Sequence, residues 1–409
     1  MKVIVVNDFA FVNGGAGQVA VTTAKLLAKK GHRVTFFSAV GPIGQELKDV
    51  QNLSVICLNQ KDILRDPNRL RAVFQGLWNF RAAKAFSSLL SNCSPRDTLI
   101  HIHALSKSIS SSIIPVAKRK GFRIVYHLHD YGIACPNLGF YDYQKDEICP
   151  RKAMGISCMM CHCDSRSVLH KGWRVLRQFV QYYLGGLPND IDAMIYISEF
   201  SRRILEPYFA TGQRLFFLSN LLSVERTERI QAEKNRVFLF VGRFAPEKAP
   251  DLFARAVARL SIPAAFIGAG ECEAELRKTC PEAEFPGWLS HEDVITYYSR
   301  ARALVFPSKC YEGQPLTVLE AKSQGIPAIV ADACAGRDEI LDGETGFIFK
   351  SGSLDSLCCQ IEKIKNDTLV AQLSERAYQS YWEQEYDEDA YVFRLEKIYR
   401  STLSGIPRN

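Results

Sequence analysis

The 409 residues include 47% hydrophobic and 23% charged side chains, the proportions of an ordinary soluble globular protein, and the length predicts two domains rather than one. No apolar run approaches the ~20 residues that span a bilayer, and no small-residue cleavage site follows the first apolar run, so we expect a cytoplasmic protein. The net charge of +7 is concentrated in the first 205 residues, where 27 Lys and Arg stand against 14 Asp and Glu, and it favours an anionic partner such as a nucleic acid, an acidic membrane or a phosphorylated substrate.

The first half of the chain alternates short apolar, β-branched runs with helical segments. The expected strands are residues 3–8, 33–39, 98–103, 123–129 and 193–198, with a long helical segment before residue 98. Short apolar strands separated by helices predict a parallel sheet that is covered on both faces.

The same alternation restarts after a polar linker that begins at Leu221. Expected strands are residues 237–242, 264–270 with the turn, 303–308, 327–332 and 346–350, with a helix at 250–260 and further helices from about residue 369. We therefore expect an α/β protein with two doubly wound, Rossmann-like domains that face each other across a cleft. The first covers residues 1–221, with a cysteine-rich insertion at about 131–166. The second covers residues 222–385, and a C-terminal helix at 386–409 packs back toward the first.

A glycine-rich turn, Gly14-Gly15-Ala16-Gly17, follows the first expected strand and opens a helix. Glycines there let backbone N–H groups approach an anion at the helix N-terminus, and Gly15 is the candidate for that contact. A tight turn with a structural role explains the same residues equally well, because the sequence is neither G-x-G-x-x-G nor a P-loop.

A basic loop, VGRFAPEKAPD, follows another expected strand in the second half. Its Arg243 and Lys248 suit a diphosphate, because the guanidinium can bind two oxygens and the ammonium adds a point charge. The alternative is a solvated loop with a salt bridge to Glu247.

Two glutamates eight positions apart, Glu312 and Glu320, flank the start of a predicted helix over residues 315–324. Glu320 lies in an apolar stretch, where a carboxylate suits the two hydroxyl protons of a ribose, and Glu312 suits hydroxyls of a second ring. The alternative places Glu320 on a solvated outer face with Lys322 and Gln324.

These loops together resemble the donor-binding domain of retaining glycosyltransferases of family 4, which have the GT-B fold. The resemblance rests on FVGRFAPEKAPDLFARAV, FIGAGE, FPGWLSHEDVITYYSRARALVFPS, YEGQPLTVLEAKSQGIPAIVAD and LDGETGFIF, in the family's order and spacing. The first half matches more loosely, through the glycine-rich turn and HLHDYG. The resemblance implies a glycosyltransferase that moves a sugar from a UDP- or GDP-sugar to a glycan or lipid-linked acceptor in surface polysaccharide synthesis. EGQPLT departs from the Gly-Phe-Gly run of many members and leaves the sugar open.

The resemblance also implies residue roles. Glu312 holds hydroxyls of the transferred sugar, Glu320 holds the ribose, and Arg243 and Lys248 neutralise the diphosphate. The other donor-binding candidates are the glycine turn, the pair that frames the nucleobase and the start of the predicted helix: Gly15, Gly287, Trp288, Gly313, Gln314, Pro315, Leu316 and Thr317.

A histidine at the end of a first-domain strand, His129, is the second catalytic candidate beside Glu312. The family often has a His here that contacts the donor sugar and supports the developing oxocarbenium ion through its main-chain carbonyl. A structural His is the alternative. We expect His127 to point the other way by strand alternation, and His101 to line the acceptor side.

Family members retain the anomeric configuration without a bound metal, because Arg and Lys neutralise the departing diphosphate. In the favoured mechanism the leaving phosphate takes the proton of the acceptor. No cofactor is then expected for catalysis, and the two glutamates are not assigned the acid and nucleophile roles of glycosidases.

Five cysteines lie close together in the sequence between Cys135 and Cys163. A structural zinc held by Cys135, Cys149, Cys158 and Cys163 would pin an insertion that has little core of its own. A similar patch occurs in some relatives. Reduced thiols or a redox disulfide are the alternatives.

A basic amphipathic segment, SVLHKGWRVLRQFVQYYLGG, begins at Ser167. Such a helix can rest on anionic lipid, which predicts peripheral contact with the inner face of a membrane. The alternative is a core helix with a solvated basic face.

Two other functions stay open. An epimerase or hydrolase of the same architecture would consume the sugar nucleotide without an acceptor. A non-catalytic scaffold would bind a nucleotide or a partner, although it does not need two cations and two glutamates together. No nucleic-acid partner is expected, because no binding motif or stacking platform accompanies the charge.

Overall fold

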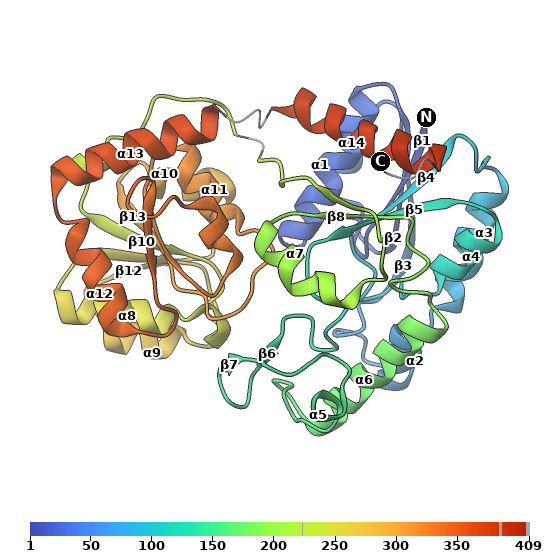
Figure 1. The fold of residues 1–409 in the computed structure, drawn as a ribbon, viewed down its shortest axis with the longest axis horizontal. Helices are drawn as coiled ribbons and strands as arrows, with labels where there is room; N and C mark the ends of the chain where they lie inside the picture. Colours follow the sequence, from blue (N-terminus) through green and yellow to red (C-terminus); the bar gives the residue numbers. More distant parts are fainter. Residues whose placement is uncertain (223, 384–386, 406–409) are drawn as a thin grey trace. The chain divides into compact units, whose positions relative to one another are not determined.

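The computed structural model describes residues 1–222, 224–383 and 387–405 (Figure 1). The chain forms two compact units. The first unit comprises Met1–Leu138, Arg151–Leu221 and Asp387–Asn409, and the second comprises Gly139–Pro150 and Leu222–Tyr386. Each unit contains one parallel sheet, which confirms the predicted α/β class with two doubly wound units.

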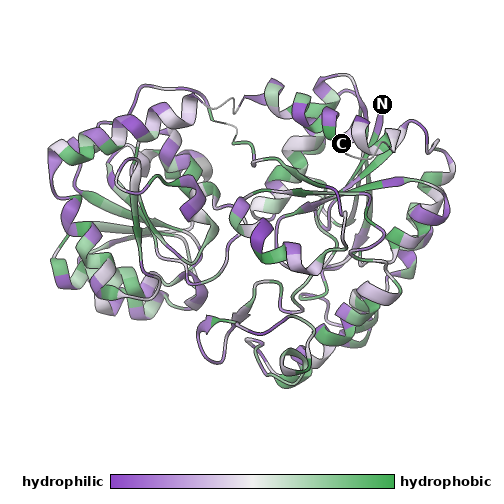
Figure 2. Cartoon of the chain, in the orientation of Figure 1, coloured by the Kyte–Doolittle hydropathy of each residue, from purple (hydrophilic) through white to green (hydrophobic). Residues whose placement is uncertain are grey.

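The first unit is built on seven parallel strands in the order β3-β2-β1-β4-β5-β8-β9. Their bounds are β1 (Lys2–Val6), β2 (Arg33–Val40), β3 (Leu53–Gln60), β4 (Thr98–Ile102), β5 (Arg123–Leu128), β8 (Ala193–Tyr196) and β9 (Leu215–Phe217). The central strands are hydrophobic along their length (Figure 2) and almost wholly buried, as helices on both faces require.

Eight helices in the described part of the first unit surround this sheet or extend from it. Their bounds are α1 (Gly15–Lys29), α2 (Arg69–Leu77), α3 (Phe80–Ser91), α4 (Ile113–Arg119), α5 (Ile156–Met159), α6 (Val168–Tyr183), α7 (Glu199–Leu205) and α14 (Glu388–Ser404). The last helix packs on α1, where the Tyr391 hydroxyl lies 2.9 Å from Thr23 Oγ1 and His32 Nε2 lies 2.7 Å from Glu396 Oε1. The end of the chain is therefore part of the first unit.

The prediction of one long helical segment before residue 98 is wrong, because that stretch contains the strand β3 followed by two helices, α2 and α3. β3 pairs with β2 alone and forms an edge of the sheet. Most of its residues are only partly buried, so its sequence lacks the continuous apolar run that marks a central strand.

The second unit has six parallel strands in the order β12-β11-β10-β13-β14-β15. Their bounds are β10 (Val237–Val241), β11 (Ala264–Ile267), β12 (Glu284–Gly287), β13 (Ala301–Phe306), β14 (Ala328–Ala331) and β15 (Gly346–Phe349). The helices are α8 (Pro250–Leu260), α9 (Glu273–Thr279), α10 (His291–Tyr298), α11 (Leu316–Ser323), α12 (Leu354–Lys363) and α13 (Asp367–Trp382).

A short hairpin of β6 (Tyr141–Asp142) and β7 (Glu147–Ile148) belongs to the second unit. Lys309 Nζ lies 2.5 Å from Asp146 Oδ2, and the rings of Phe140 and Tyr311 lie 6.1 Å apart. The cysteine-rich segment expected as an insertion of the first domain is thus divided between the two units.

Candidate functional site

The basic loop and the first glutamate of the acidic pair meet at the carboxyl edge of the second sheet. β10 and β13 are neighbours, so the loops that follow them emerge side by side. A 3₁₀ turn, Pro246–Lys248, presents Lys248, whose Nζ lies 2.5 Å from Glu312 Oε1. Ser308 Oγ donates to the same oxygen at 2.6 Å.

This ion pair is largely shielded from water, since the Lys248 and Glu312 side chains are 21% and 14% exposed. Burial alone would raise the pKa of Glu312, but Lys248 and the Ser308 hydroxyl outweigh it and lower that pKa. Burial would likewise lower the pKa of Lys248, but Glu312 raises it. Both groups are therefore charged at neutral pH and hold each other in place.

Arg243 lies at the entrance of the same loop with 70% of its side chain exposed. Its guanidinium donates to Glu247 Oε1 at 2.9 Å, which is the pairing that the alternative interpretation named. Glu247 also ties the two loops together, because its carbonyl accepts from the backbone N–H of Lys309 at 2.9 Å and lies 3.2 Å from Ser308 Oγ. The exposed guanidinium keeps donors directed at solvent, where an anion can bind.

Glycines bring the loops after β10 and β11 into close contact. A Cβ at Gly268, where φ is +141°, would lie 1.9 Å from the Gly242 carbonyl oxygen. The Gly268 N–H donates to the Gly287 carbonyl at 2.9 Å, and Trp288 follows with 79% exposure. Backbone without side chains therefore lies beside the exposed Trp288 indole. An aromatic ring such as a nucleobase can pack in this arrangement.

The N-terminus of α11 follows the acidic loop. Pro315 is the N-cap rather than the first helical residue, and no side chain caps the helix, so the N–H groups of Leu316 and Thr317 are available to an anion. Just ahead of the cap, Gln314 Nε2 donates to Glu339 Oε1 at 2.7 Å. Burial raises the pKa of Glu339.

Glu320 projects from α11 and is 9% exposed, so the alternative of a solvated outer face is wrong. The buried hydroxyl of Tyr298, at the end of α10, donates to Glu320 Oε2 at 3.2 Å. No site role was assigned to Tyr298, Ser308 or Glu339 from the sequence, because only the folded chain shows which glutamate or amide each of them contacts.

The remaining candidates belong to the first unit. Gly15 is the first residue of α1, and Gly14 caps that helix with a φ of +84° and no side-chain bond. His129 follows β5, and its Nε2 lies 2.9 Å from Nδ1 of His103. The expectation that His127 points away is wrong, because its ring stacks on that of His129 at 4.2 Å. Residues two apart in an extended strand share a face.

The predicted zinc ligands fall in both units. Cys135, Cys158 and Cys163 are buried in the first unit, whereas Cys149 follows the hairpin of the second. Buried Lys171, on α6, places Nζ 3.3 Å from Cys163 Sγ and 3.7 Å from Cys158 Sγ.

In the part of the chain that the structure describes, no helix combines the length and the hydropathy that a membrane crossing needs.

Comparisons with known proteins match the two halves to two sequence models. The one described as "Glycosyltransferase Family 4" matches residues 13–226, more than half of the chain, and "Glycosyl transferases group 1" matches residues 224–380.

Among curated proteins, the chain is 33% identical over 109 residues to a GDP-mannose-dependent alpha-mannosyltransferase of Mycolicibacterium smegmatis, covering 27% of this chain and 29% of the relative. It is 30% identical over 148 residues to a lipopolysaccharide 1,6-galactosyltransferase of Salmonella typhimurium, covering 33% of this chain and 41% of the relative. The chain thus spans less than half the length of these relatives.

Solved structures share the fold over almost the whole chain. Sucrose-phosphate synthase from Thermosynechococcus elongatus superposes with a TM-score of 0.73 at 17% identity, covering 99% of this chain and all of that one. Anabaena HepE, in complex with UDP and glucose, superposes with a TM-score of 0.68 at 15% identity, covering 98% and 100%. The predicted GT-B type of fold is confirmed.

Proposed function

Because the chain belongs to glycosyltransferase family 4, we propose that it transfers a sugar from a UDP- or GDP-sugar to a glycan or lipid-linked acceptor in surface polysaccharide synthesis, with retention of configuration. One observation carries the proposal. Lys248, Glu312 and Ser308 form a buried, charged cluster at the carboxyl edge of a doubly wound sheet, where such folds bind nucleotides.

The cations and the helix end of this cluster suit the departing nucleoside diphosphate. Breaking the anomeric bond places negative charge on the phosphate oxygen, and groups already aimed at that charge stabilise the transition state more than the ground state. Lys248 is fixed by Glu312, Arg243 is exposed, and the uncapped N-terminus of α11 adds N–H donors. These groups supply charge neutralisation from the chain itself.

The glutamates then act as hydroxyl acceptors. Glu320 is oriented by Tyr298 and suits a ribose, while the Glu312 carboxylate suits a sugar hydroxyl as donor. His129 supports the positive charge that develops on the sugar through its carbonyl, and Gly15 offers a backbone N–H at the start of α1.

The donor base is open between uracil and guanine. The mycobacterial relative is named for GDP-mannose, and the HepE structure contains UDP. Isothermal titration calorimetry with UDP, GDP and ADP separates these possibilities. Glu320→Ala removes the proposed ribose acceptor, and Glu344→Ala is the matched control, because Glu344 pairs with exposed Arg376 just before β15.

We expect one nucleotide to bind wild type at micromolar concentration, Glu320→Ala to weaken it at least 10-fold, and Glu344→Ala to leave it unchanged. No binding to folded wild type would favour the non-catalytic scaffold. Release of free sugar from the donor at an undiminished rate without any acceptor would favour the hydrolase.

A peripheral membrane contact through α6 is the second part of the proposal, and the orientation of the helix supports it. The apolar residues, which the alternative of a core helix would pack inward, are largely exposed, whereas several polar ones are buried. Exposed on α6 are Val168, Leu169, Leu176, Phe179 and Tyr183, and buried are Lys171, Arg177, Gln178 and Gln181. The alternative of a core helix with a solvated basic face is therefore wrong.

The buried polar side chains of α6 satisfy loop carbonyls that would otherwise lack donors. Arg177 donates to the carbonyl of Pro136 at 3.2 Å, and Gln178 Nε2 donates to those of Gly132 and Ile133. This pairing explains why the polar face turns inward. The apolar face is left at the surface, where it needs a partner.

α2 extends this surface, and hydrophobic residues run along both helices (Figure 2). Leu70 and Phe74 are 74% and 67% exposed, and Trp173 Nε1 joins the helices by donating to the Val73 carbonyl at 3.3 Å. A hollow of about 230 Å³ between them is lined by Leu64, Val73 and Leu169 and by the cations Arg69 and Arg166. Apolar side chains beside cations suit anionic lipid.

A structural zinc on Cys135, Cys149, Cys158 and Cys163 is the third part of the proposal. Cys158 Sγ and Cys163 Sγ both contact the Lys171 Nζ, at 3.7 Å and 3.3 Å, so these two sulfurs lie near one another, and cysteine sulfur is a usual zinc ligand. Metal analysis of purified protein tests it. We expect Cys158→Ser to lower the zinc content by one equivalent relative to wild type, and wild type without stoichiometric zinc or iron would refute this part.

A further inference from the structure

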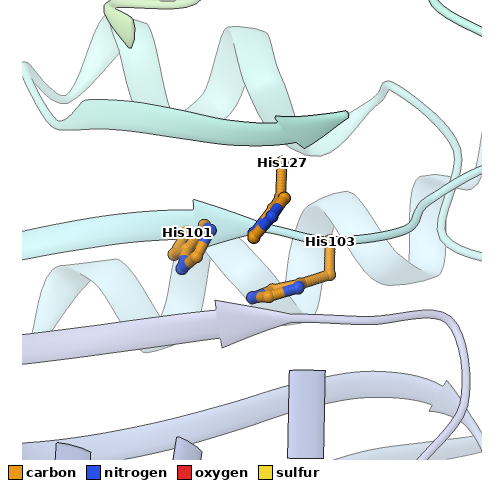
Figure 3. A group of neighbouring side chains, drawn as sticks. All are labelled: His101, His103 and His127. Carbon is orange, nitrogen blue, oxygen red and sulfur yellow. The ribbon is translucent and has the colours of Figure 1, made fainter. Parts of the chain in front are cut away.

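A group of four histidines occupies the carboxyl edge of the first sheet. His101 and His103 come from β4 and its end, and His127 and His129 come from β5 and its end, which pair in parallel. Neighbouring rings lie 4.1 Å to 5.4 Å apart between centroids. Figure 3 shows three of them, His101, His103 and His127, gathered near the ends of the two strands.

These three rings are buried, with exposures of 0%, 2% and 0%. Only two of their six nitrogens have a hydrogen-bond partner among the described residues. Nδ1 of His101 lies 2.7 Å from the Tyr399 hydroxyl, and Nδ1 of His103 lies 2.9 Å from His129 Nε2. Nε2 of His101, Nε2 of His103 and both nitrogens of His127 have none within the described part of the chain. Buried polar atoms are normally paired, so four orphans in one cluster indicate an absent partner.

We propose that His101, His103 and His127 bind a divalent transition-metal ion of the zinc class. One nitrogen from each ring lies within 4.8 Å of the others. Zinc–nitrogen bonds of ~2.0–2.1 Å at tetrahedral angles separate nitrogens by roughly 3.3 Å, which modest ring rotation achieves. A bound ion would give a partner to three of the four nitrogens that have none among the described residues.

The partnered nitrogens fit this role. A histidine that binds metal through Nε2 carries its proton on Nδ1 and donates it to a second group, which fixes the ring. His101 has the Tyr399 hydroxyl oxygen for that purpose, and His103 has Nε2 of His129. The unpartnered atoms are thus the ones left to bind the ion.

The ligand type selects the metal. Imidazole nitrogens without a carboxylate favour zinc, copper or nickel over magnesium and calcium, which require oxygen. A bound ion would clamp the ends of β4 and β5 together and leave a fourth position for water.

X-ray absorption at the zinc edge tests the proposal on full-length protein after dialysis against chelator and addition of zinc. Cys158→Ser with Cys163→Ser serves as the background, because it removes thiolates that would add a sulfur shell at ~2.3 Å. We expect about one equivalent of zinc with a nitrogen shell at ~2.0–2.1 Å. No retained zinc, or no nitrogen shell, would overturn the proposal.

Two further variants locate the ion. His127→Gln should lose it, whereas His32→Gln, a change at a histidine bound to Glu396 on α14, should retain it. Tyr399→Phe keeps all three ligands and removes one orienting hydroxyl, so we expect zinc affinity to fall about 10- to 100-fold. Should His127→Gln not fold, the Tyr399→Phe affinity decides: an unchanged value counts against the site.

Discussion

The two units place opposite kinds of chemistry at the same edge of the same kind of sheet. In the second unit the loops after β10 and β13 carry a buried ion pair, Lys248 with Glu312, and an exposed guanidinium. In the first unit the ends of β4 and β5 carry stacked imidazoles whose pKa values burial lowers. Its buried carboxylate, Asp8, accepts from the backbone N–H groups of Lys107, Ser108 and Ile109.

This difference shows that the doubly wound sheet fixes where ligands bind but not which ligands. Charge at the second edge suits an anion whose charge grows during reaction. Neutral lone pairs at the first edge suit a cation or a hydroxyl-bearing ring. The following changes test the division, starting with the largest expected effect.

Lys248→Met removes the buried cation from the second edge. We expect the rate of nucleoside diphosphate release from the donor sugar to fall about 10²- to 10³-fold, as for loss of one group aimed at developing charge. Steady-state assays with the donor identified by calorimetry measure it. Lys365→Met, at an exposed lysine paired with Glu362, is the control and should keep the wild-type rate. Equal rates in wild type and both variants would contradict the proposal that charge at the second edge stabilises the departing diphosphate.

The residues of this edge were predictable because their spacing is a motif. Arg243, Lys248, Glu312 and Glu320 follow strands with strong apolar runs, and the structure places them on loops or a helix as expected. Tyr298 contacts Glu320 from 22 positions earlier in the chain, and nothing local in the sequence announces such a contact. The first edge was harder, because HLHDYG, which contains His127 and His129, matches the family only loosely, and no motif includes His101 and His103.

Leu169→Glu combined with Leu176→Glu places charges on the exposed apolar face of α6. We expect flotation with phosphatidylglycerol-containing vesicles to weaken about 10- to 100-fold, because partial burial of the two leucines in lipid contributes about 1.5–3 kcal/mol together. Leu341→Glu, at a leucine with 58% exposure in the second unit, should bind like wild type. Wild type that does not float at low salt would refute the membrane contact.

The orientation of α6 could not be predicted from the sequence. An amphipathic pattern separates two faces but does not say which one packs against the protein. Here the inward choice depends on carbonyls of residues 132–136, which only the folded chain brings within reach of Arg177 and Gln178. The edge strands β3, β9 and β12 were missed for a related reason, since partly exposed strands lack a continuous apolar run.

Tyr298→Phe removes the hydroxyl that orients Glu320 and leaves every charge of the second edge in place. We expect the Kd for the nucleotide to rise about 3- to 5-fold, the equivalent of one hydrogen bond of roughly 0.5–1 kcal/mol. Calorimetry measures the change. Tyr297→Phe is the matched control, because the Tyr297 ring packs against Arg300 instead. A Kd for Tyr298→Phe that matches both wild type and control would mean that Glu320 needs no orienting partner.

The smallest effect concerns acid stability of the second unit. Lys248 and the Ser308 hydroxyl face Glu312 and lower its pKa against the opposing effect of burial, with Cys310 also in contact. A lowered folded-state pKa gives stability that is complete above the ordinary value of 4.5 and is lost as pH falls through the folded value.

Glu312→Gln removes this titration, so its free energy of unfolding should change less than that of wild type between pH 7 and about pH 3. Urea unfolding at both pH values measures the difference, with Glu344→Gln as the control. At pH 7 the variant leaves Lys248 without its counter-ion, so wild type should be the more stable protein there. If both proteins lost the same stability in acid, the Lys248–Glu312 ion pair would not stabilise this edge. The difference in charge between the two sheet edges would then depend on Arg243 and the α11 N-terminus alone.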